Sequence, residues 1–173
     1  EVKESRDRVR AAIIQSGFDF PAKKITVNLA PADLPKESGR FDLPIALGIL
    51  AASGQIAPEK LAQYEFAGEL ALSGMLRPVR GALAMAWQGM QAGRSFVLPQ
   101  ENAEQAAVMR GITVYGARSL GEVAAHLNGI EPLAQTACQV TQRSSENAKL
   151  PDLIDVKGQH TARLALEIAA AGG

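Results

Sequence analysis

Apolar residues recur along the chain with two different spacings, and these spacings predict its strands and helices. Residues 24–29 (KITVNL) alternate between apolar and polar, which is typical of a half-buried strand. Residues 42–52 are apolar nearly all round, so we expect a buried helix with Asp42 as its N-cap and Pro44 in its first turn. The same criteria predict further helices at 1–16, 58–62, 81–92, 101–109, 120–128 and 161–171, and strands at 66–72, 75–78, 95–98 and 112–115.

Strands and helices alternate from residue 66 to residue 128, where Ser119 is the expected cap of the last helix. This order predicts crossover connections laid on one sheet. The expected fold class is α+β with α/β-type crossovers, a mixed sheet with helices packed on it. Residues 130–151 are rich in polar side chains and lack an apolar period, as in a linker. We therefore divide the chain into a domain at 1–129, a linker at 130–151 and the start of a second module at 152–173.

Composition narrows the classes of function that the chain can serve. The 173 residues carry 18 Lys and Arg against 18 Asp and Glu, so binding to DNA or an anionic membrane requires a local basic patch. One cysteine excludes an intramolecular disulfide, and two distant histidines do not have the spacing of metal ligands, so we expect no metal site. No apolar run approaches the roughly 18 residues that span a bilayer. We expect no membrane partner and interpret the chain as an excised part of a cytoplasmic protein.

Basic residues gather at two places in the sequence. One group surrounds the polar loop before residue 42, and the other lies between residues 73 and 100, where three arginines occur without any acidic residue. We expect these side chains to contact DNA phosphates without reading base sequence. Ordinary surface charge, balanced by Asp33 and Glu37 near the loop, is the competing interpretation. The candidate DNA-binding residues are Lys23, Lys24, Lys36, Arg40, Arg77 and Arg80.

The helix predicted at 81–92 carries a set of large apolar side chains that includes Met85, Trp87 and Met90. We interpret these three as core residues rather than as a platform on which bases stack. Aromatic residues make up only 5% of the chain, which argues against a groove that stacks several bases.

Residues 35–52 resemble the site of the Lon protease domain, in which the motif Pro-Lys-Asp-Gly-Pro-Ser-Ala-Gly precedes an apolar helix. Residues 35–37 (PKE) match its opening, and residues 68–74 (GELALSG) with 78–81 (PVRG) resemble the strands before Lon's catalytic-lysine helix. By this alignment Asp42 stands in the place of Lon's nucleophilic serine and Leu83 in the place of its lysine. Neither side chain can take over those roles. The resemblance implies a Lon-like fold, shared with a ribosomal protein's second domain and the GHMP kinases, without peptidase activity.

Over nearly its whole length the chain is identified as a member of the ComM/YifB family, often labelled magnesium-chelatase-like. The segments that carry this resemblance are VKESRDRVRAAI (2–13), FPAKKITVNLAPADLPKE (20–37), FAGELALSG (66–74) and DVKGQHTARLALEIAAAGG (155–173). Membership implies that residues 1–129 form a Lon-like domain lacking its first strands. It also implies that residues 152–173 begin an AAA+ ATPase module and stop before its phosphate-binding loop. Val156 and Gly158 would then lie near the adenine of ATP in the intact protein only.

The family resemblance implies a non-catalytic domain of a hexameric AAA+ DNA motor, a ComM-like branch-migration helicase in natural transformation and recombination. The intact protein is expected to be an ATPase with ATP and Mg as cofactors, and to act as a homohexamer on branched or single-stranded DNA. For this chain alone we expect no enzymatic activity and no cofactor. The alternatives are a magnesium-chelatase-type ATPase subunit, a purely structural oligomerisation domain, and a surviving hydrolase with Ser38 or Ser53 as nucleophile.

Overall fold

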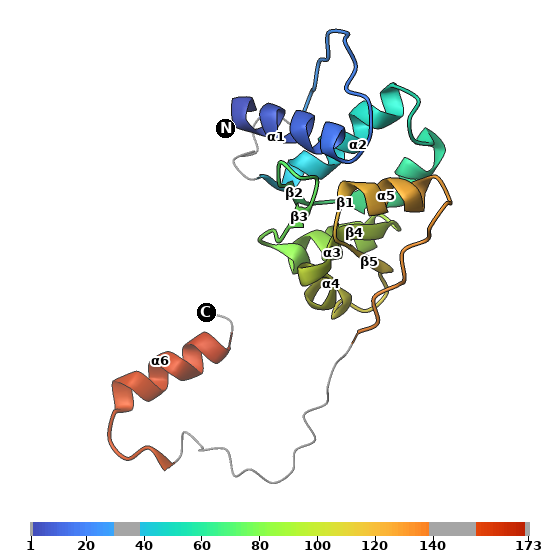
Figure 1. The fold of residues 1–173 in the computed structure, drawn as a ribbon. Helices are drawn as coiled ribbons and strands as arrows, with labels where there is room; N and C mark the ends of the chain where they lie inside the picture. The colour runs from blue at the N-terminus through green and yellow to red at the C-terminus, as the bar shows by residue number, and fades with distance from the viewer. Residues whose placement is uncertain (1, 30–38, 139–154, 172–173) are drawn as a thin grey trace. The chain divides into compact units, whose positions relative to one another are not determined.

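The computed structural model describes residues 2–29, 39–138 and 155–171 (Figure 1). The chain divides into a first unit, Glu1–Val140, and a second unit, Thr141–Gly173. In the second unit the described residues form one helix, α6 (His160–Ala170), close to the predicted 161–171. Its apolar side chains Leu164, Leu166 and Ile168 are more than half exposed, at 57%, 55% and 54%. None of the described helices is long and apolar enough to cross a membrane.

Parallel strands joined by helices form the centre of the first unit. The order of strands in this sheet is β1-β4-β5, and both pairings are parallel. Parallel neighbours need a crossover connection, which α3 supplies between β1 and β4 and α4 supplies between β4 and β5. The predicted α+β class with crossovers is confirmed, whereas the likeness to the Lon domain stays a prediction. The elements are β1 (Tyr64–Phe66), α3 (Ala82–Gln91), β4 (Ser95–Pro99), α4 (Gln100–Ala107) and β5 (Val114–Ala117).

A separate antiparallel hairpin, β2 (Glu69–Leu70) with β3 (Leu76–Arg77), lies between β1 and α3 in the chain. The strand predicted at 66–72 is therefore two strands in two sheets. The chain leaves the first sheet at Gly68, because the backbone N–H and C=O of this residue form hydrogen bonds outside the sheet. Its N–H donates to the Arg40 carbonyl at 2.9 Å, and its carbonyl accepts from the N–H of Leu43 at 3.0 Å.

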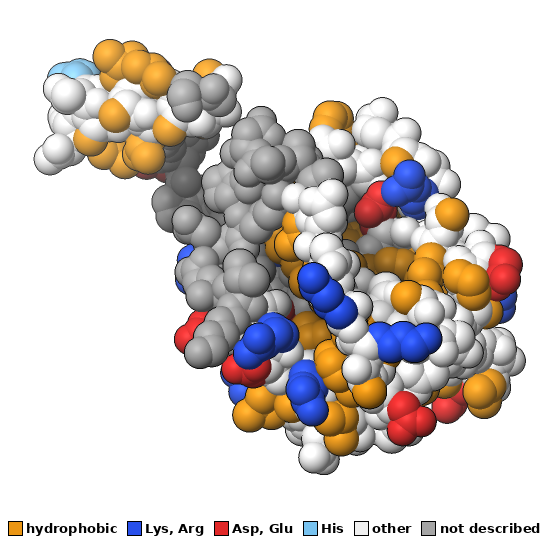
Figure 2. Space-filling model, turned by 90° about the horizontal axis from the view of Figure 1, so that it is seen from above, with side chains coloured by type: hydrophobic (Ala, Val, Ile, Leu, Met, Phe, Trp, Pro, Cys, Tyr) orange, Lys and Arg blue, Asp and Glu red, His pale blue; other side chains and the backbone are white. Residues whose placement is uncertain are grey.

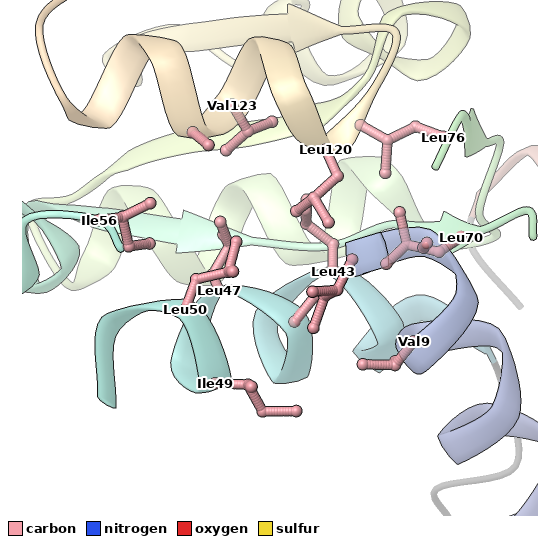
Figure 3. Packing of buried hydrophobic residues seen from close by; sticks show 14 of the residues in the cluster. Val9, Leu43, Leu47, Ile49, Leu50, Ile56, Leu70, Leu76, Leu120 and Val123 are labelled. Atoms are coloured by element: carbon pink, nitrogen blue, oxygen red, sulfur yellow. The ribbon is translucent and has the colours of Figure 1, made fainter. Parts of the chain in front are cut away.

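Two hydrophobic clusters cover the two faces of the parallel sheet. Successive residues of a strand point to opposite faces, and in β4 Val97 joins one cluster while Phe96 and Leu98 join the other. Helices α1 and α2 lie on one side of the parallel strands, and α3 and α4 lie on the other (Figure 1). On the first side, Figure 3 shows Leu43 and Leu47 of α2 pointing towards Leu120 of α5. The remaining elements are α1 (Val2–Gln15), η1 (Gly39–Phe41), α2 (Asp42–Ala52), η2 (Pro58–Gln63) and α5 (Leu120–Leu127).

The sequence-based predictions hold for the helices. Helix α2 buries most of its side chains, as its uniformly apolar sequence predicts. Ser119 caps α5, since its side-chain oxygen accepts a hydrogen bond from the backbone N–H of Glu122 at 3.2 Å. Local signals of this kind are sufficient because each depends on residues within one or two helical turns.

The strand predicted at 24–29 is wrong for the described structure, in which these residues form no strand. Ile25 is 37% exposed and Val27 is 49% exposed, so the alternating apolar face is not buried. A strand requires a neighbour for its backbone N–H and C=O groups. In the described part of the chain no strand pairs with residues 24–29.

Residues 130–138, which were predicted to begin the linker, are held on the first unit. The N–H of Thr136 donates to the carbonyl of Val114 at 2.8 Å, and Gln135 bridges antiparallel to Tyr115. The N–H of Leu133 donates to Nδ1 of His126 at 3.0 Å. Nε2 of His126 therefore carries the proton, and it lies 3.1 Å from the hydroxyl oxygen of Tyr64. The rest of the predicted linker, from residue 139, falls largely outside the described residues.

Acid should weaken this attachment. Burial, and secondarily the charge of Lys60, lowers the pKa of His126 below its ordinary value of 6.5, and protonation would remove the acceptor that Leu133 uses. The folded state therefore favours neutral His126. As the pH falls below 6.5, the unfolded chain takes up a proton that the folded chain does not, and stability falls until the pH passes the lowered pKa.

Urea unfolding at neutral and mildly acidic pH measures this effect. His126→Phe should cost about 1–3 kcal/mol at neutral pH for two lost hydrogen bonds, and it should make stability less dependent on pH. His160→Phe, at an exposed position on α6, is the matched control and should leave the pH dependence unchanged. Equal pH dependence in both variants would show that His126 does not hold the 130–138 segment.

Candidate functional site

The side chain of Asp42, the position aligned with Lon's serine, is buried and fully hydrogen-bonded. It is 1% exposed at the start of α2. Its Oδ1 accepts hydrogen bonds from Ser5 Oγ at 2.6 Å and Arg8 Nη2 at 3.3 Å. Its Oδ2 accepts from Arg8 Nε at 2.8 Å and from the backbone N–H of Leu70 at 3.3 Å. One carboxylate thus connects α1, α2 and β2.

The predicted N-cap role of Asp42 is wrong. Phe41 occupies the cap position, and no side chain caps α2 there. The carboxylate turns to Arg8 and Ser5 of another helix instead of to the first N–H groups of its own. One of those N–H groups, that of Leu43, is satisfied by the carbonyl of Gly68.

Arg8 neutralises the charge that burial of Asp42 would otherwise leave uncompensated. The hydrogen bond to Asp42 raises the pKa of Arg8, against the opposing effect of burial, and the charge of Glu69 adds to the increase. A buried carboxylate without such a partner would cost several kcal/mol. With both oxygens engaged, Asp42 is placed to hold three elements together rather than to accept a proton from a substrate.

The described residues do not assemble the other chemistry considered from the sequence. Leu83 is 40% exposed on α3 and has no titratable group. The hydroxyl of Ser53 donates to the carbonyl of Leu50 at 3.1 Å and accepts from the amide of Gln55 at 2.8 Å, and neither group is a base. Ser38 lies outside the described residues. Among the residues that the structure describes, no group of three His, Cys, Asp or Glu could hold a metal ion.

The structure brings some of the candidate DNA-binding residues together. Arg77 of β3 faces Glu69 across the hairpin. The side chain of Glu69 also packs against Gly39, so this acidic residue lies between Arg77 and the residue that precedes Arg40. Arg80 is exposed three residues beyond Arg77.

The remaining candidates lie apart from this group or cannot be placed. Lys23 and Lys24 are exposed on the irregular segment after α1, whereas Lys36 lies outside the described residues. Arg40 is half-buried with its guanidinium 5.0 Å from the centre of the Phe41 ring, and its Nε has no hydrogen-bond partner among the described residues. Figure 2 shows one face of the molecule, on which Lys and Arg side chains lie among apolar and uncharged surface, some of them beside Asp or Glu.

The arginine-rich window at 73–100 contains no acidic residue, but in the fold acidic residues from other segments lie near two of its arginines. Arg94 Nη1 lies 2.6 Å from Glu65 Oε1, and Arg77 has Glu69 opposite it. Arg80 takes part in none of the ion pairs found among the described residues. Of the arginines in this window, Arg80 is therefore the one best able to give its full charge to a phosphate.

Trp87 is a functional candidate that sequence reasoning missed, because it was predicted to be in the core. It is 46% exposed, while α3 buries Ala82, Ala86 and Gly89 instead. A side chain on Gly89 would lie 3.2 Å from Ile112 and 3.4 Å from Glu65, so this face of α3 packs closely. The small residues Ala82, Ala86 and Gly89 recur at helical spacing, and this pattern could have predicted from the sequence that Trp87 faces solvent.

A hollow of about 330 Å³ lies on the outer face of α1. It is lined by Asp7, Arg10, Ala11, Ile14 and Gln15. Its charged groups have opposite signs and Ile14 is 48% exposed, so the hollow lacks the convergent polar groups typical of a small-molecule site.

Comparison with known proteins gives a consistent result over the whole chain. A family model described as subunit ChlI of Mg-chelatase matches residues 1–102. The protein YifB of Salmonella typhimurium is 49% identical over 172 residues, which are 99% of this chain and 33% of that protein. YifB of Escherichia coli is 47% identical, again over 99% of this chain and 33% of its own length.

The name of a third relative refers to a function. The competence protein ComM of Haemophilus influenzae is 47% identical over 174 residues, covering 99% of this chain and 34% of that protein. The chain thus spans about one third of the length of the curated relatives that it matches.

Replacing Arg8 should show how strongly the first unit depends on the Asp42 contact. Arg8→Met keeps most of the aliphatic stem and leaves the carboxylate of Asp42 buried without its counter-charge. We expect a loss of about 3–5 kcal/mol in the free energy of unfolding, measured by urea denaturation.

The exposed pair on the same helix is a matched control. Arg6 and Asp7 are 3.2 Å apart, and their side chains are 67% and 61% exposed. Arg6→Met should cost less than about 1 kcal/mol, because water already solvates both charges. Similar losses in the two variants would contradict the structural role assigned to Asp42.

Proposed function

The chain belongs to the family of the ChlI subunit of Mg-chelatase and is part of a ComM-like protein, and from this we propose that it is a non-catalytic domain of an ATP-driven DNA motor. The relative ComM is named a competence protein, and competence is the uptake of DNA by cells. In the proposal this domain guides DNA and helps to assemble a homohexameric ring. Hydrolysis of ATP, with Mg as cofactor, takes place elsewhere in the intact protein.

The observation that carries the proposal is the exposed pair Arg77 and Arg80 at the junction of the hairpin and α3. The 173 residues have no net charge, so attraction to DNA has to come from such a local group. Arginine contacts to phosphates position DNA without reading its sequence. This suits a motor that has to move along any sequence.

The engagement of Asp42 supports a non-catalytic role for this domain. The hydrogen bonds of its carboxylate are internal and join α1, α2 and β2. A scaffold held rigid in this way is suited to keeping the hairpin and its arginines in a fixed position.

The second unit fits the ATPase part of the proposal. Val156 is 40% exposed, and Gly158 adopts a positive φ of 76° that favours glycine. Gly158 is exposed as well, and we propose that both residues lie near the adenine of ATP in the intact protein.

A magnesium-chelatase-type ATPase subunit is the second candidate function. The description of the matching family model favours it. Stimulation of the intact protein's ATPase by DNA supports the motor, whereas stimulation by a porphyrin-binding partner supports the chelatase. Each outcome excludes the other as the main activity.

Charge reversal at the hairpin tests the DNA contact. The double variant Arg77→Glu and Arg80→Glu should weaken binding to labelled DNA, measured by fluorescence anisotropy over a series of salt concentrations. Each lost phosphate contact lowers the slope of log affinity against log salt by about 0.7 for single strands and about 0.9 for duplex. Two lost contacts should therefore lower the slope by about 1.4 to 1.8.

Arg110→Glu is the control, because Arg110 is exposed after α4 and away from the hairpin in sequence. It should leave the slope unchanged. If the hairpin variant binds DNA with unchanged affinity and slope, Arg77 and Arg80 do not contact DNA, and the proposal loses the observation that carries it.

A further inference from the structure

A line of exposed, uncharged side chains runs along the outer face of α3. Leu83, Trp87 and Gln91 recur every fourth residue, which places them above one another on the helix. We call these three residues the α3 stripe. Trp87 at its centre is 46% exposed and Leu83 is 40% exposed. The helix meets the rest of the unit through its opposite, small-residue face, so the stripe is free among the described residues.

One exposed cation, Arg80, lies just before α3, and α3 itself carries no acidic side chain. No Asp or Glu occurs from residue 73 to residue 100. Arg80 precedes Gly81, the N-cap residue of α3, and it joins no ion pair among the described residues. At the other end, Arg94 is already paired with Glu65. A ligand that follows the stripe thus meets one free cation, and a negatively charged ligand complements it.

We propose that the α3 stripe binds single-stranded DNA, with Trp87 stacked on an unpaired base and Arg80 bound to a nearby phosphate. This inference rests on the proposed function and adds which form of DNA the domain holds. An indole presents a flat apolar face that stacks on any base, and the bases of a duplex are already stacked on one another. The amides of Gln88 and Gln91, exposed on the same side, can hydrogen-bond base edges.

The spacing of the two groups is compatible with one short stretch of DNA. The helix from Ala82 to Trp87 extends over about 7.5 Å, and Arg80 lies two residues before Ala82. A flexible strand can therefore place a base on Trp87 while a neighbouring phosphate reaches Arg80. Arg80 supplies charge and Trp87 supplies stacking, so the two contributions respond differently to salt.

A second copy of the chain is a less suitable occupant. An interface between identical copies commonly uses the same patch on both partners. The acid-free stripe would then offer no carboxylate to the Arg80 of either copy. A polyanion satisfies this charge directly.

Trp87 reports its own contact, because it is the only tryptophan among the 173 residues. The experiment titrates the chain with a thymidine oligonucleotide and follows indole fluorescence. A duplex of equal length is the comparison. We expect quenching by the single strand and little change with the duplex.

Variants separate stacking from charge. Trp87→Ala should weaken binding of the single strand about 5- to 150-fold, which corresponds to 1–3 kcal/mol of base stacking at 1.4 kcal/mol per factor of ten. It should leave the salt slope unchanged. Trp87→Phe should recover most of the affinity. Ile14→Ala, which removes an apolar side chain that is 48% exposed on α1, away from both the stripe and the hairpin, is the control and should bind as the unchanged chain does.

The outcomes distinguish this inference from the function on which it rests. If Arg77→Glu with Arg80→Glu abolishes binding while Trp87→Ala binds normally and the indole is not quenched, the proposal for the α3 stripe is wrong. The proposed DNA-binding function of the domain is then still supported. If neither DNA form binds the unchanged chain, both proposals fail. If fluorescence shifts with protein concentration alone and the mass doubles in light scattering, the stripe is an interface between copies and the inference is wrong.

Discussion

The first unit depends on the need to neutralise one buried carboxylate. Asp42 is 1% exposed, and a charge in that position requires a cationic partner and filled hydrogen-bond sites. Arg8 lies 34 residues earlier in the chain and Leu70 lies 28 residues later. Satisfying Asp42 therefore fixes α1 and β2 against the start of α2. The backbone of Gly68 then bonds to Arg40 and Leu43 on either side of the same point, so the hairpin that carries Arg77 is positioned from there.

The parallel sheet separates this scaffold from the surface proposed for binding. The cluster built on α1, α2 and α5 fills one face of the sheet, and the cluster built on α3 and α4 fills the other. The first face contains the buried ion pair. The second face is formed by small residues packed closely, which leaves Leu83 and Trp87 of α3 on the outside.

The sequence predicts the elements whose signals are local and fails where the partner is distant. The cap at Ser119 and the helices around it depend on neighbouring residues and are confirmed. Residues 24–29 have the alternation of a strand, yet a strand also needs a neighbour that no local pattern supplies. The N-cap prediction for Asp42 could not include Arg8, which is brought close only by the fold. The roles of the basic residues, and the likeness to the Lon domain, stay predictions.

Large side chains are usually the ones whose replacement disturbs a fold most, but on α3 the small residues are the sensitive ones. Gly89 and Ala86 are held against their neighbours, so an added methyl group there disturbs packing. Trp87, the largest residue on the helix, faces solvent and can be exchanged with little effect on folding. A mutational scan that selects only for abundance would therefore mark the smallest residues of α3 and pass over its tryptophan. Comparing such a scan with one that selects for activity would separate the two faces of a single ten-residue helix.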